Sequence, residues 1–390
     1  MLRPVVPALV LSLMLASTGA GAHDPSAYGG LFRSHDLGAT WLNADAGLFL
    51  NAALTMAVDP RDSAHLLLGT DLGVMRSQSG GRSWAPEAPG QILGAAFAVV
   101  FLTDGGSAIA AAPGGVFRLR DGQWSGADAP DGAVPARAIA PGAAPDRVYL
   151  LGHSELFTSA DGGQSFTPVA GDLPEAAQIT GLAVATRPQE VVFALVDGAL
   201  MASEDAGRHW QGRAGPPVPA PFEAIALDPA ATGRMWAAGA DRIWLSDNLG
   251  STWRAFGQPL PEPGTQVRGI AADPAATTLV VTTHRGMYRS ADAGHSWALK
   301  EGNLPIHLEA GPLIRDPSDP RTLYAVYSLM PYAEVWRTAL EGGNLLARAD
   351  PVSLAGACAF VLLLMIGGVL LVRWLARQRT GRAAGGRPVP

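Results

Sequence analysis

Hydrophobic residues along the chain come in short runs that end in turns. Runs such as Ala53–Ala57, Leu66–Leu68 and Val148–Leu151 are bounded by Gly, Pro and Asp. A recurring phrase of Gly, two apolar residues, Arg and Ser, as in Gly73–Ser77 and Gly286–Ser290, follows such runs. Short apolar runs between turn residues are typical of β-strands. The pattern predicts an all-β body made of many short strands.

An octapeptide recurs through this body at a nearly constant interval. It occupies residues 34–41 (Ser-His-Asp-Leu-Gly-Ala-Thr-Trp) and returns at residues 77–84, 159–166, 203–210, 246–253 and 290–297. A degenerate copy, Arg120–Trp124, fills the widest gap, and with it the copies begin 40 to 44 residues apart. A fixed period of this length indicates a repeat architecture, and four short strands per repeat are typical of a propeller blade.

The third position of the octapeptide holds a small polar residue. It is Asp in four copies and Asn or Ser in two, at Asp36, Asp161, Asp205, Asp292, Asn248 and Ser79. Such a side chain can accept hydrogen bonds from N–H groups of the turn and from Ser or Thr hydroxyl groups. The Gly two places on permits positive φ, and the closing Trp can bury its ring between blades. Because a catalytic acid would not tolerate Asn or Ser, we predict a structural role for this position.

The octapeptide resembles the Asp-box (BNR) repeat of sialidases, sortilin-type receptors, some endoglucanases and the photosystem II assembly factor family. The resemblance covers residues 30–338. It implies a β-propeller whose boxes lie on the face opposite the ligand site. It is specific for the fold and says little about function.

Seven segments qualify as the first strand of a blade, the strand that lines the axis. They are residues 53–57, 97–102, 136–140, 179–184, 223–227, 267–271 and 312–315. No first strand precedes the octapeptide at residues 34–41, so we expect residues 28–43 to complete the last blade and both ends of the body to pair in one sheet. The phrase Val335–Thr338 resembles a further third strand and leaves eight blades as the alternative.

Both ends of the chain carry membrane-targeting patterns. Residues 1–22 combine Arg3, an apolar run and a small-residue exit, which is typical of a cleaved signal peptide. Residues 352–372 lack charges and are long enough to span a bilayer as a helix. Five arginines follow in residues 373–390, and the positive-inside rule assigns that tail to the cytoplasm. The sequence predicts a single-pass protein of the bacterial inner membrane, with a periplasmic propeller in residues 23–348.

Charge and cysteine content exclude several functions. Without Arg3 and the five tail arginines, the body has 22 basic and 34 acidic residues, a net charge of −12. Nucleic acid is therefore a poor partner, and a cationic protein surface or a metal ion is a better one. Cys358, the only cysteine, falls within the predicted span, so the body has neither a disulfide nor a thiol nucleophile.

Polar residues at the turns between second and third strands are the candidate ligands. If the blades superpose, these turns bring together Asp71, His153, Asp197, Asp241, His284 and Arg285 at one mouth of the central channel. Imidazoles and carboxylates could bind a divalent metal or a polar ligand there. The alternative is that these are ordinary turn residues, because Asp and Gly favour turns in any case.

Two functions remain open. The first is a non-enzymatic module that binds a protein partner, as in an assembly factor for a membrane complex, and needs no cofactor. The second is a glycan-acting hydrolase on the same fold. A sialidase would require three arginines, a Tyr–Glu pair and an acidic donor, and Phe32-Arg33-Ser34 lacks the Ile-Pro of the motif that such enzymes carry. Asp-box endoglucanases use a cleft between two propellers, whereas this chain has one. Neither reading assigns a catalytic residue.

Overall fold

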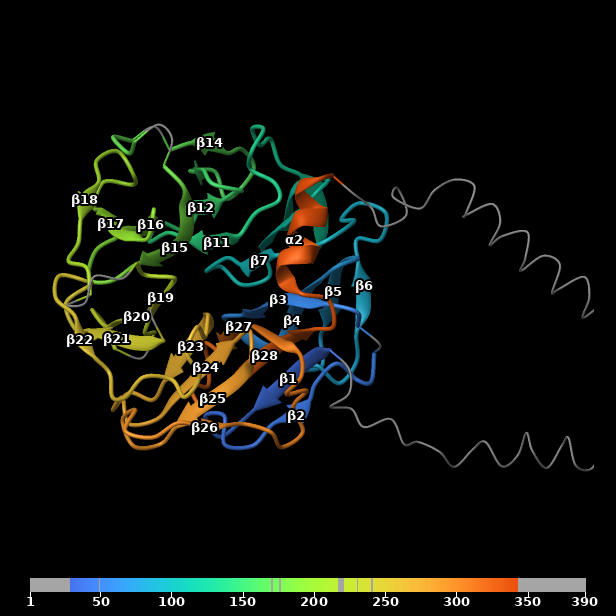
Figure 1. Cartoon of the computed structure of the whole chain (residues 1–390). Coiled ribbons are helices and arrows are strands. Elements are labelled where there is room, and N and C mark those ends of the chain that lie inside the picture. Colours follow the sequence, from blue (N-terminus) through green and yellow to red (C-terminus); the bar gives the residue numbers. More distant parts are fainter. Residues whose placement is uncertain are drawn as a thin grey trace, which may run out of the picture. The chain divides into compact units, whose positions relative to one another are not determined.

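The computed structural model describes residues 29–342 except 49, 170, 175–176, 217–220, 230 and 240. They form seven four-stranded sheets arranged as blades around an axis (Figure 1). Neighbouring strands within each sheet are antiparallel. The predicted seven-bladed propeller is confirmed.

Six blades consist of four consecutive strands. They are β3 (Ala53–Asp59), β4 (Asp62–Thr70), β5 (Gly73–Ser77) and β6 (Ala85–Glu87); β7 (Ala98–Phe101), β8 (Ala108–Ala112), β9 (Gly115–Arg120) and β10 (Gln123–Gly126); β11 (Ala138–Pro141), β12 (Val148–Leu151), β13 (Leu156–Ser159) and β14 (Thr167–Pro168); β15 (Ile179–Ala185), β16 (Val191–Val196), β17 (Ala199–Ser203) and β18 (Gln211–Gly212); β19 (Ala224–Leu227), β20 (Met235–Gly239), β21 (Arg242–Ser246) and β22 (Arg254–Ala255); and β23 (Val267–Ala272), β24 (Leu279–Thr283), β25 (Gly286–Ser290) and β26 (Ala298–Leu299).

The seventh blade joins the two ends of the body. Its inner strands are β27 (Glu309–Arg315) and β28 (Leu323–Ser328), and its outer strands are β1 (Gly30–Ser34) and β2 (Leu42–Asn43). Strands β1 and β28 pair along their whole length. Phe32 and Tyr327 are fully buried and pack edge to face, with ring centroids 5.3 Å apart. The predicted closure by the N-terminal segment is confirmed.

The eighth-blade alternative is wrong. The phrase Val335–Thr338 lies in the helix α2 (Tyr332–Leu340), which buries Val335 and Ala339 against Ala52, Leu54 and Ala95. The preceding strand β28 already pairs with β27 on one side and with β1 on the other, so the seventh blade is complete without this segment.

The core lies between the blades. Second strands are almost wholly buried, as at β16, where all six residues are inaccessible, whereas the fourth strands are mostly exposed. Box tryptophans contribute to this core, since Trp41 is 1% exposed and its indole N–H donates to the carbonyl of Gly38. Burying a ring of this size between two sheets is a large favourable contribution to the stability of the closed ring.

The Asp-boxes are closed by side-chain hydrogen bonds. In the copy at Asp292, the Ser296 hydroxyl donates to Oδ2 at 2.6 Å, the Ser296 N–H donates to Oδ1 at 2.9 Å, and Ser290 donates to Oδ1 at 2.8 Å. These bonds lower the pKa of Asp292 to about 2, and the same types of bond, opposed by burial, lower the pKa of Asp36 and Asp161 to about 2. Hydrogen bonds from His209 lower the pKa of Asp205 as well.

The two boxes with Asn or Ser in place of Asp form the same turn, but with other hydrogen-bond donors and acceptors. Asn248 accepts from the Thr252 N–H at 2.9 Å, but its amide donates to the Thr252 hydroxyl, also at 2.9 Å. Ser79 makes equivalent bonds with Ser83. The degenerate copy has a two-residue turn instead, with Asp121 and Gly122 both at positive φ between β9 and β10. This is the form expected of a tight hairpin.

The predicted membrane segments lie outside the described residues. These are the signal peptide at residues 1–22, the span at 352–372 and the tail at 373–390. Within the described part of the chain, no helix combines the length and hydrophobicity needed to cross a membrane.

Candidate functional site

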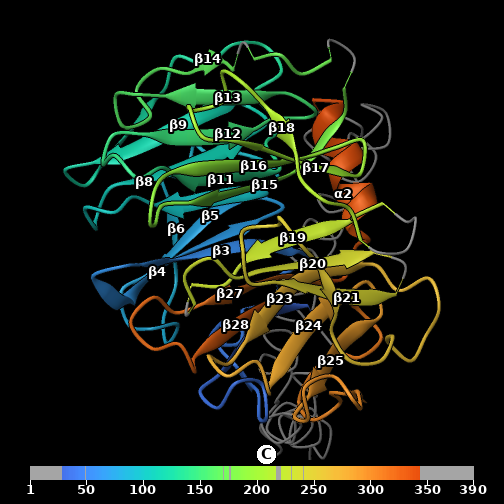
Figure 2. The same cartoon turned by 90° about the vertical axis from the view of Figure 1, so that its left-hand side faces the viewer.

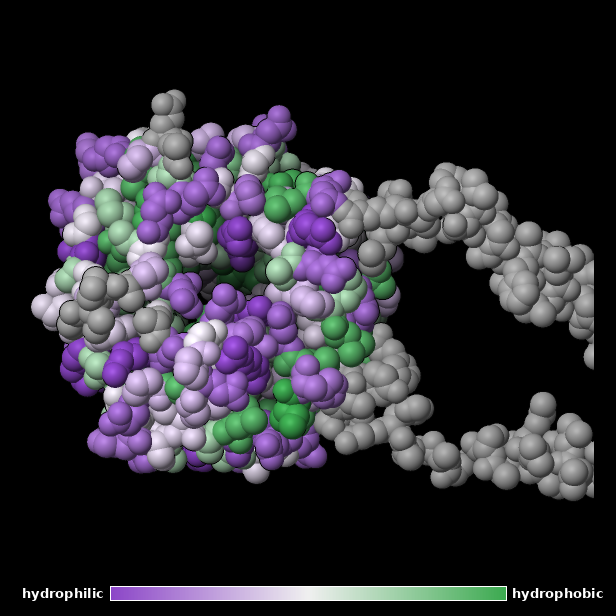
Figure 3. All heavy atoms as spheres, viewed as in Figure 1, coloured by the Kyte–Doolittle hydropathy of each residue, from purple (hydrophilic) through white to green (hydrophobic). Residues whose placement is uncertain are grey.

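The central channel opens on two faces. Turns between first and second strands and the Asp-boxes end on one face, called here the box face. Turns between second and third strands end on the other, where α2 lies, called here the α2 face (Figures 1 and 2). The α2 face is hollowed at its centre, with hydrophobic residues at the bottom of the hollow (Figure 3).

All six predicted ligand residues lie on the α2 face, and the three carboxylates bond to nearby loops. Asp71 accepts from the Asn51 amide at 2.9 Å, Asp197 from the N–H of Gln178 at 3.2 Å, and Asp241 from the N–H of Thr265 at 2.8 Å. Each donor precedes the first strand of a blade, so the carboxylates anchor the segments that enter the ring. Burial, followed by the nearby carboxylate of Asp241, raises the pKa of Glu223.

The two histidines and Arg285 also have local partners. His284 Nδ1 accepts from the N–H of Gln266 at 3.0 Å. Arg285 forms an exposed ion pair with Glu262 at 3.2 Å and donates to the carbonyl of Pro263. The ring of His153 stacks on Trp336 with centroids 6.2 Å apart. Among the described residues, no group of three or more His, Cys, Asp and Glu side chains is arranged to hold a metal ion.

Helix α2 runs beside this opening and contacts the entrances of several blades. Its Tyr332 hydroxyl donates to the carbonyl of Ala53 at 2.8 Å, and its Tyr332 N–H donates to Glu309 at 3.0 Å. The guanidinium of Arg268 lies 4.7 Å from the Tyr332 ring and pairs with Glu309. The helix thus links the first strands of three neighbouring blades, β23, β27 and β3.

A pocket lies at the opposite end of the channel, on the box face. Its volume is about 680 Å³, and its walls come from the first strands of four successive blades, β15, β19, β23 and β27. Apolar walls are formed by Val184, Trp236, Ile270, Leu313 and Ile314. The charged lining residues are Arg187, Arg234, Arg315 and Asp228.

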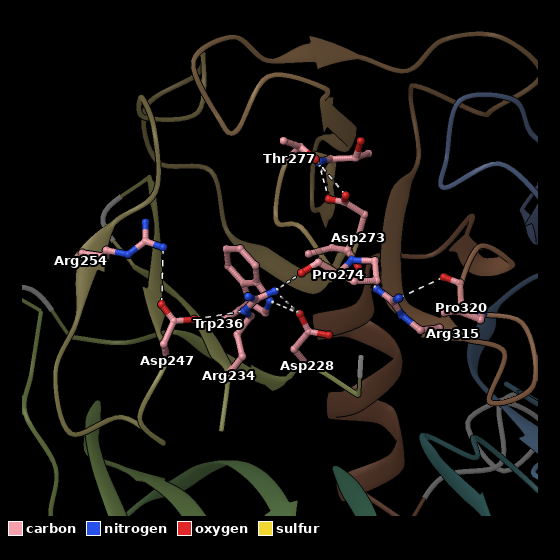
Figure 4. A network of polar contacts seen from close by, with 12 residues as sticks. Asp228, Arg234, Trp236, Asp247, Arg254, Asp273, Pro274, Thr277, Arg315 and Pro320 are labelled. Atoms are coloured by element: carbon pink, nitrogen blue, oxygen red, sulfur yellow. Dashed lines mark hydrogen bonds and ion pairs between the residues drawn. The ribbon is translucent and has the colours of Figure 1, made fainter. Parts of the chain in front are cut away.

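Asp228 and Arg234 form the centre of a network in the pocket wall (Figure 4). Asp228 is 6% exposed, accepts a hydrogen bond from the Trp236 indole at 3.3 Å and lies 3.6 Å from a guanidinium nitrogen of Arg234. Arg234 also donates to the carbonyl of Pro274 in the next blade at 2.8 Å and pairs with Asp247 at 3.2 Å. The network therefore neutralises a buried carboxylate and links two blades.

Arg315 is held differently, because its hydrogen bonds go to backbone carbonyls. It donates to Pro320 at 3.0 Å and to Ala272 (Figure 4). Burial lowers the pKa of Arg315, while Asp228 and Asp273 act in the opposite direction. An arginine remains charged throughout the physiological range. Asp273 itself accepts from Thr277 and Thr278 and caps its own turn.

The charge of the pocket is opposite to that of the whole body. Its lining has three arginines and one aspartate, whereas the body outside the termini carries a net charge of −12. Guanidinium groups bind carboxylates and phosphates through paired hydrogen bonds, and the apolar walls can take aliphatic side chains. The arrangement is therefore suited to a ligand that combines anionic and apolar groups.

Sequence reasoning missed this pocket. It noted the repeated Asp-Pro turns, including Asp228-Pro229, only as turn signals, and the resemblance directed attention to the face opposite the boxes. The signal in the sequence was partial: Arg187 and Arg234 lie between a first and a second strand, and Arg315 is the last residue of β27, but arginines such as Arg61 and Arg321 occupy similar positions outside the pocket.

The fold and the boxes define the class: a seven-bladed β-propeller of the Asp-box type. No protein-family model matches the chain, and a search of curated proteins found no match.

Among solved structures, the chain is similar to YCF48 bound to D1 peptide, with 18% identity, a TM-score of 0.55, and coverage of 72% of this chain and 93% of that one. YCF48 from Cyanidioschyzon merolae gives 16% identity, a TM-score of 0.57, and coverage of 72% and 97%. The GH74 xyloglucanase from Xanthomonas campestris gives 18% identity and a TM-score of 0.55, covering 71% of this chain but only 52% of the enzyme. At these identities the similarity shows the fold.

Proposed function

We propose that the protein is a non-enzymatic binding module that holds a segment of a partner protein in the axial pocket of the box face. This binding would contribute to the assembly of a membrane complex. The observation that carries the proposal is the concentration of Arg187, Arg234 and Arg315 around apolar walls in an acidic body. A peptide with a carboxylate and aliphatic side chains satisfies both parts of that lining. The similarity to YCF48, one structure of which holds a D1 peptide, supports a peptide ligand.

The composition of the lining also disfavours hydrolysis. Glycoside hydrolases of both stereochemical types require a pair of carboxyl groups. Asp228 is the single carboxylate among the lining residues, and its contacts are with Arg234 and Trp236. The glycan-acting alternative rests on the fold that the chain shares with a xyloglucanase, of which the match covers only 52%. Release of reducing ends from xyloglucan by the purified protein would support that alternative.

The pocket is tested by comparing two arginine substitutions in the full chain. Arg315→Gln removes a charge from the pocket, whereas Arg254→Gln removes an exposed arginine outside the pocket lining, which pairs with Asp247 at 3.6 Å. Cross-linked partners would be purified from membranes and quantified by mass spectrometry. We expect Arg315→Gln to lose at least one partner that wild type and Arg254→Gln retain. Identical partner sets in all three proteins would rule out the pocket as the binding site.

The membrane tether is the second part of the proposal. A single-pass anchor at residues 352–372 would keep the propeller at high local concentration beside a membrane complex. A chain that stops after Gly342 is then expected to lose partner association at native expression, although it keeps the pocket. Equal association of this truncated chain would contradict the tether and leave the pocket proposal intact.

A further inference from the structure

Exposed leucines gather on one part of the α2 face. Leu72, Leu93, Leu329 and Leu340 are 72%, 49%, 42% and 41% exposed. They lie in the β4–β5 turn, the loop between β6 and β7, the end of β28 and the last turn of α2. We call these four residues the apolar ridge. Hydrophobic residues come to the surface where α2 and β3 meet (Figure 3).

Contacts between the segments that carry these leucines place the segments side by side. The Leu329 N–H donates to the carbonyl of Asn51, and the Asn51 amide donates to Asp71, beside Leu72. A Cβ built on Gly73 would meet the carbonyl of Ile92 at 2.6 Å, so the turn that carries Leu72 touches the loop that carries Leu93. Ala339, next to Leu340, packs with Ala52, next to Asn51, and with Ala95 from the loop that carries Leu93.

The position of the ridge relative to the end of the propeller indicates what covers it. The compact unit ends at Gly342, two residues after Leu340, and the uncharged stretch begins at residue 352. The nine residues between them can reach at most about 30 Å when fully extended. If residues 352–372 span a bilayer, a lipid surface is therefore always within reach of the ridge.

We infer that the apolar ridge inserts into the interfacial layer of the membrane, so that the α2 face is the membrane-facing side and the pocket on the box face is presented away from the lipid. This inference rests on the membrane anchor of the proposed function. Clusters of exposed apolar side chains of this kind mark interaction surfaces, and leucines partition favourably into the boundary between headgroups and acyl chains.

Charge does not drive this contact. Asp71, Glu334 and Glu341 surround the ridge, and Arg337 is the basic residue of α2. A surface with more acidic than basic residues does not attract anionic lipid, so the proposed contact with the membrane is apolar. It is expected to form on neutral phosphatidylcholine and to persist at high salt, unlike contacts made by polybasic segments.

A matched control exists on the opposite face. Leu42, at the start of β2 directly after a box, is 59% exposed. It has the same side chain as the ridge residues but lies on the other face. The full chain with Cys358→Ser would carry a single fluorophore at Leu72→Cys, Leu93→Cys or Leu42→Cys. Each protein would be reconstituted into phosphatidylcholine vesicles that contain a lipid with a nitroxide near the top of its acyl chain.

We expect several-fold stronger quenching at positions 72 and 93 than at position 42, unchanged at high salt. Equal quenching at all three positions, in proteins that float with the vesicles, would overturn the inference and leave the anchor standing. Failure of the full chain to float with the vesicles would refute the anchor itself, and the inference with it.

A second set of variants tests whether Leu72 and Leu93 contribute to the insertion, with the label elsewhere on the ridge. With the fluorophore at Leu340→Cys, the double substitution Leu72→Glu and Leu93→Glu is expected to reduce quenching several-fold, whereas Leu42→Glu leaves it unchanged. Because all three leucines are exposed, the substitutions are compatible with folding, and circular dichroism would verify this. An unchanged signal in the double variant contradicts the inference.

Discussion

The guanidinium carbon of Arg137 lies 4.4 Å from the centroid of the Trp336 ring, with the ring of His153 stacked beside it. Trp336 belongs to α2, and Arg137 directly precedes β11 in a blade far from α2 in sequence. Together with the pair of Arg268 and Tyr332, this contact holds the helix against the ring of blades.

Removal of the Trp336 ring is therefore expected to loosen α2 without unfolding the propeller. A cation–π contact of this kind contributes about 1–2 kcal/mol, which corresponds to roughly a 5- to 30-fold change in a local opening equilibrium. Trp336→Ala should raise amide hydrogen exchange in residues 332–340 by about that factor. Arg337→Ala, on the exposed side of the helix, is the control, and equal protection in both variants would show that the contact is without energetic effect.

Closure of the ring depends on the pairing of β1 with β28, so a core substitution there should destabilise the whole propeller. Phe32 is fully buried against Tyr327, and Phe32→Ala is expected to lower the free energy of unfolding by about 3–5 kcal/mol. Leu42→Ala, in the exposed β2 of the same blade, should change it by less than about 0.5 kcal/mol. Urea denaturation measures both, and equal effects would contradict the role of β1 in closure.

The pocket network predicts that two arginines, both in contact with Asp247, contribute unequally to the stability of the protein. Arg234→Ala removes the ion pair with the buried Asp228 and the bond to Pro274, so it should cost about 1–3 kcal/mol of stability. Arg254→Ala should cost less than about 1 kcal/mol, because Arg254 is 62% exposed and solvent screens its ion pair. Chemical denaturation of the two variants would test this, and equal costs would contradict it.

The boxes predict a loss of stability in acid. The folded-state pKa values of Asp36, Asp161 and Asp292 are about 2, below the 3.8 of an unperturbed Asp. The stabilisation is thus fully present above the unfolded pKa and is lost as pH falls from about 4 through 2. Replacing all three by Asn should flatten the dependence of the melting temperature on pH in this window.

The box at Asn248 provides the opposite test. Asn248→Asp introduces a carboxylate beside the Thr252 hydroxyl, as at Asp36 and Thr40, and should steepen the acid limb. The same melting measurements serve for this variant. If the melting temperature falls with pH at the same slope in the wild type, the triple variant and Asn248→Asp, these box carboxylates contribute nothing to stability in acid.

Much of the fold could be predicted because its determinants are local. A box needs only Ser290, Asp292 and Ser296 within one turn, and the alternation of apolar runs with such turns places each first strand. The closure of the ring could be predicted by counting strands. No first strand precedes the octapeptide at residues 34–41, so this segment must complete the last blade of the body. Val335–Thr338 left an eighth blade open because Val-Trp-Arg-Thr has the composition of a third strand, and composition does not reveal that these residues form a helix after a strand already paired on both sides.

The candidate site could be predicted only in part. The turn residues from Asp71 to Arg285 do lie on one face, as the repeat period required, but their hydrogen bonds go to neighbouring loops. Three of the four charged residues of the pocket lining, Asp228, Arg234 and Arg315, come from two blades. Whether a turn residue faces the axis depends on the twist and tilt of each blade.

By itself, the sequence determined the blade as a unit and predicted the pairing of the two ends, because these follow from a period of 40 to 44 residues and from hydrogen bonds within single turns, whereas the structure decided between seven and eight blades. Only the tertiary structure decided where α2 packs and that three arginines and Asp228 surround one pocket on the box face. Those contacts join residues far apart in the chain, and they exist only after the ring has closed and brought the first strands around a common axis.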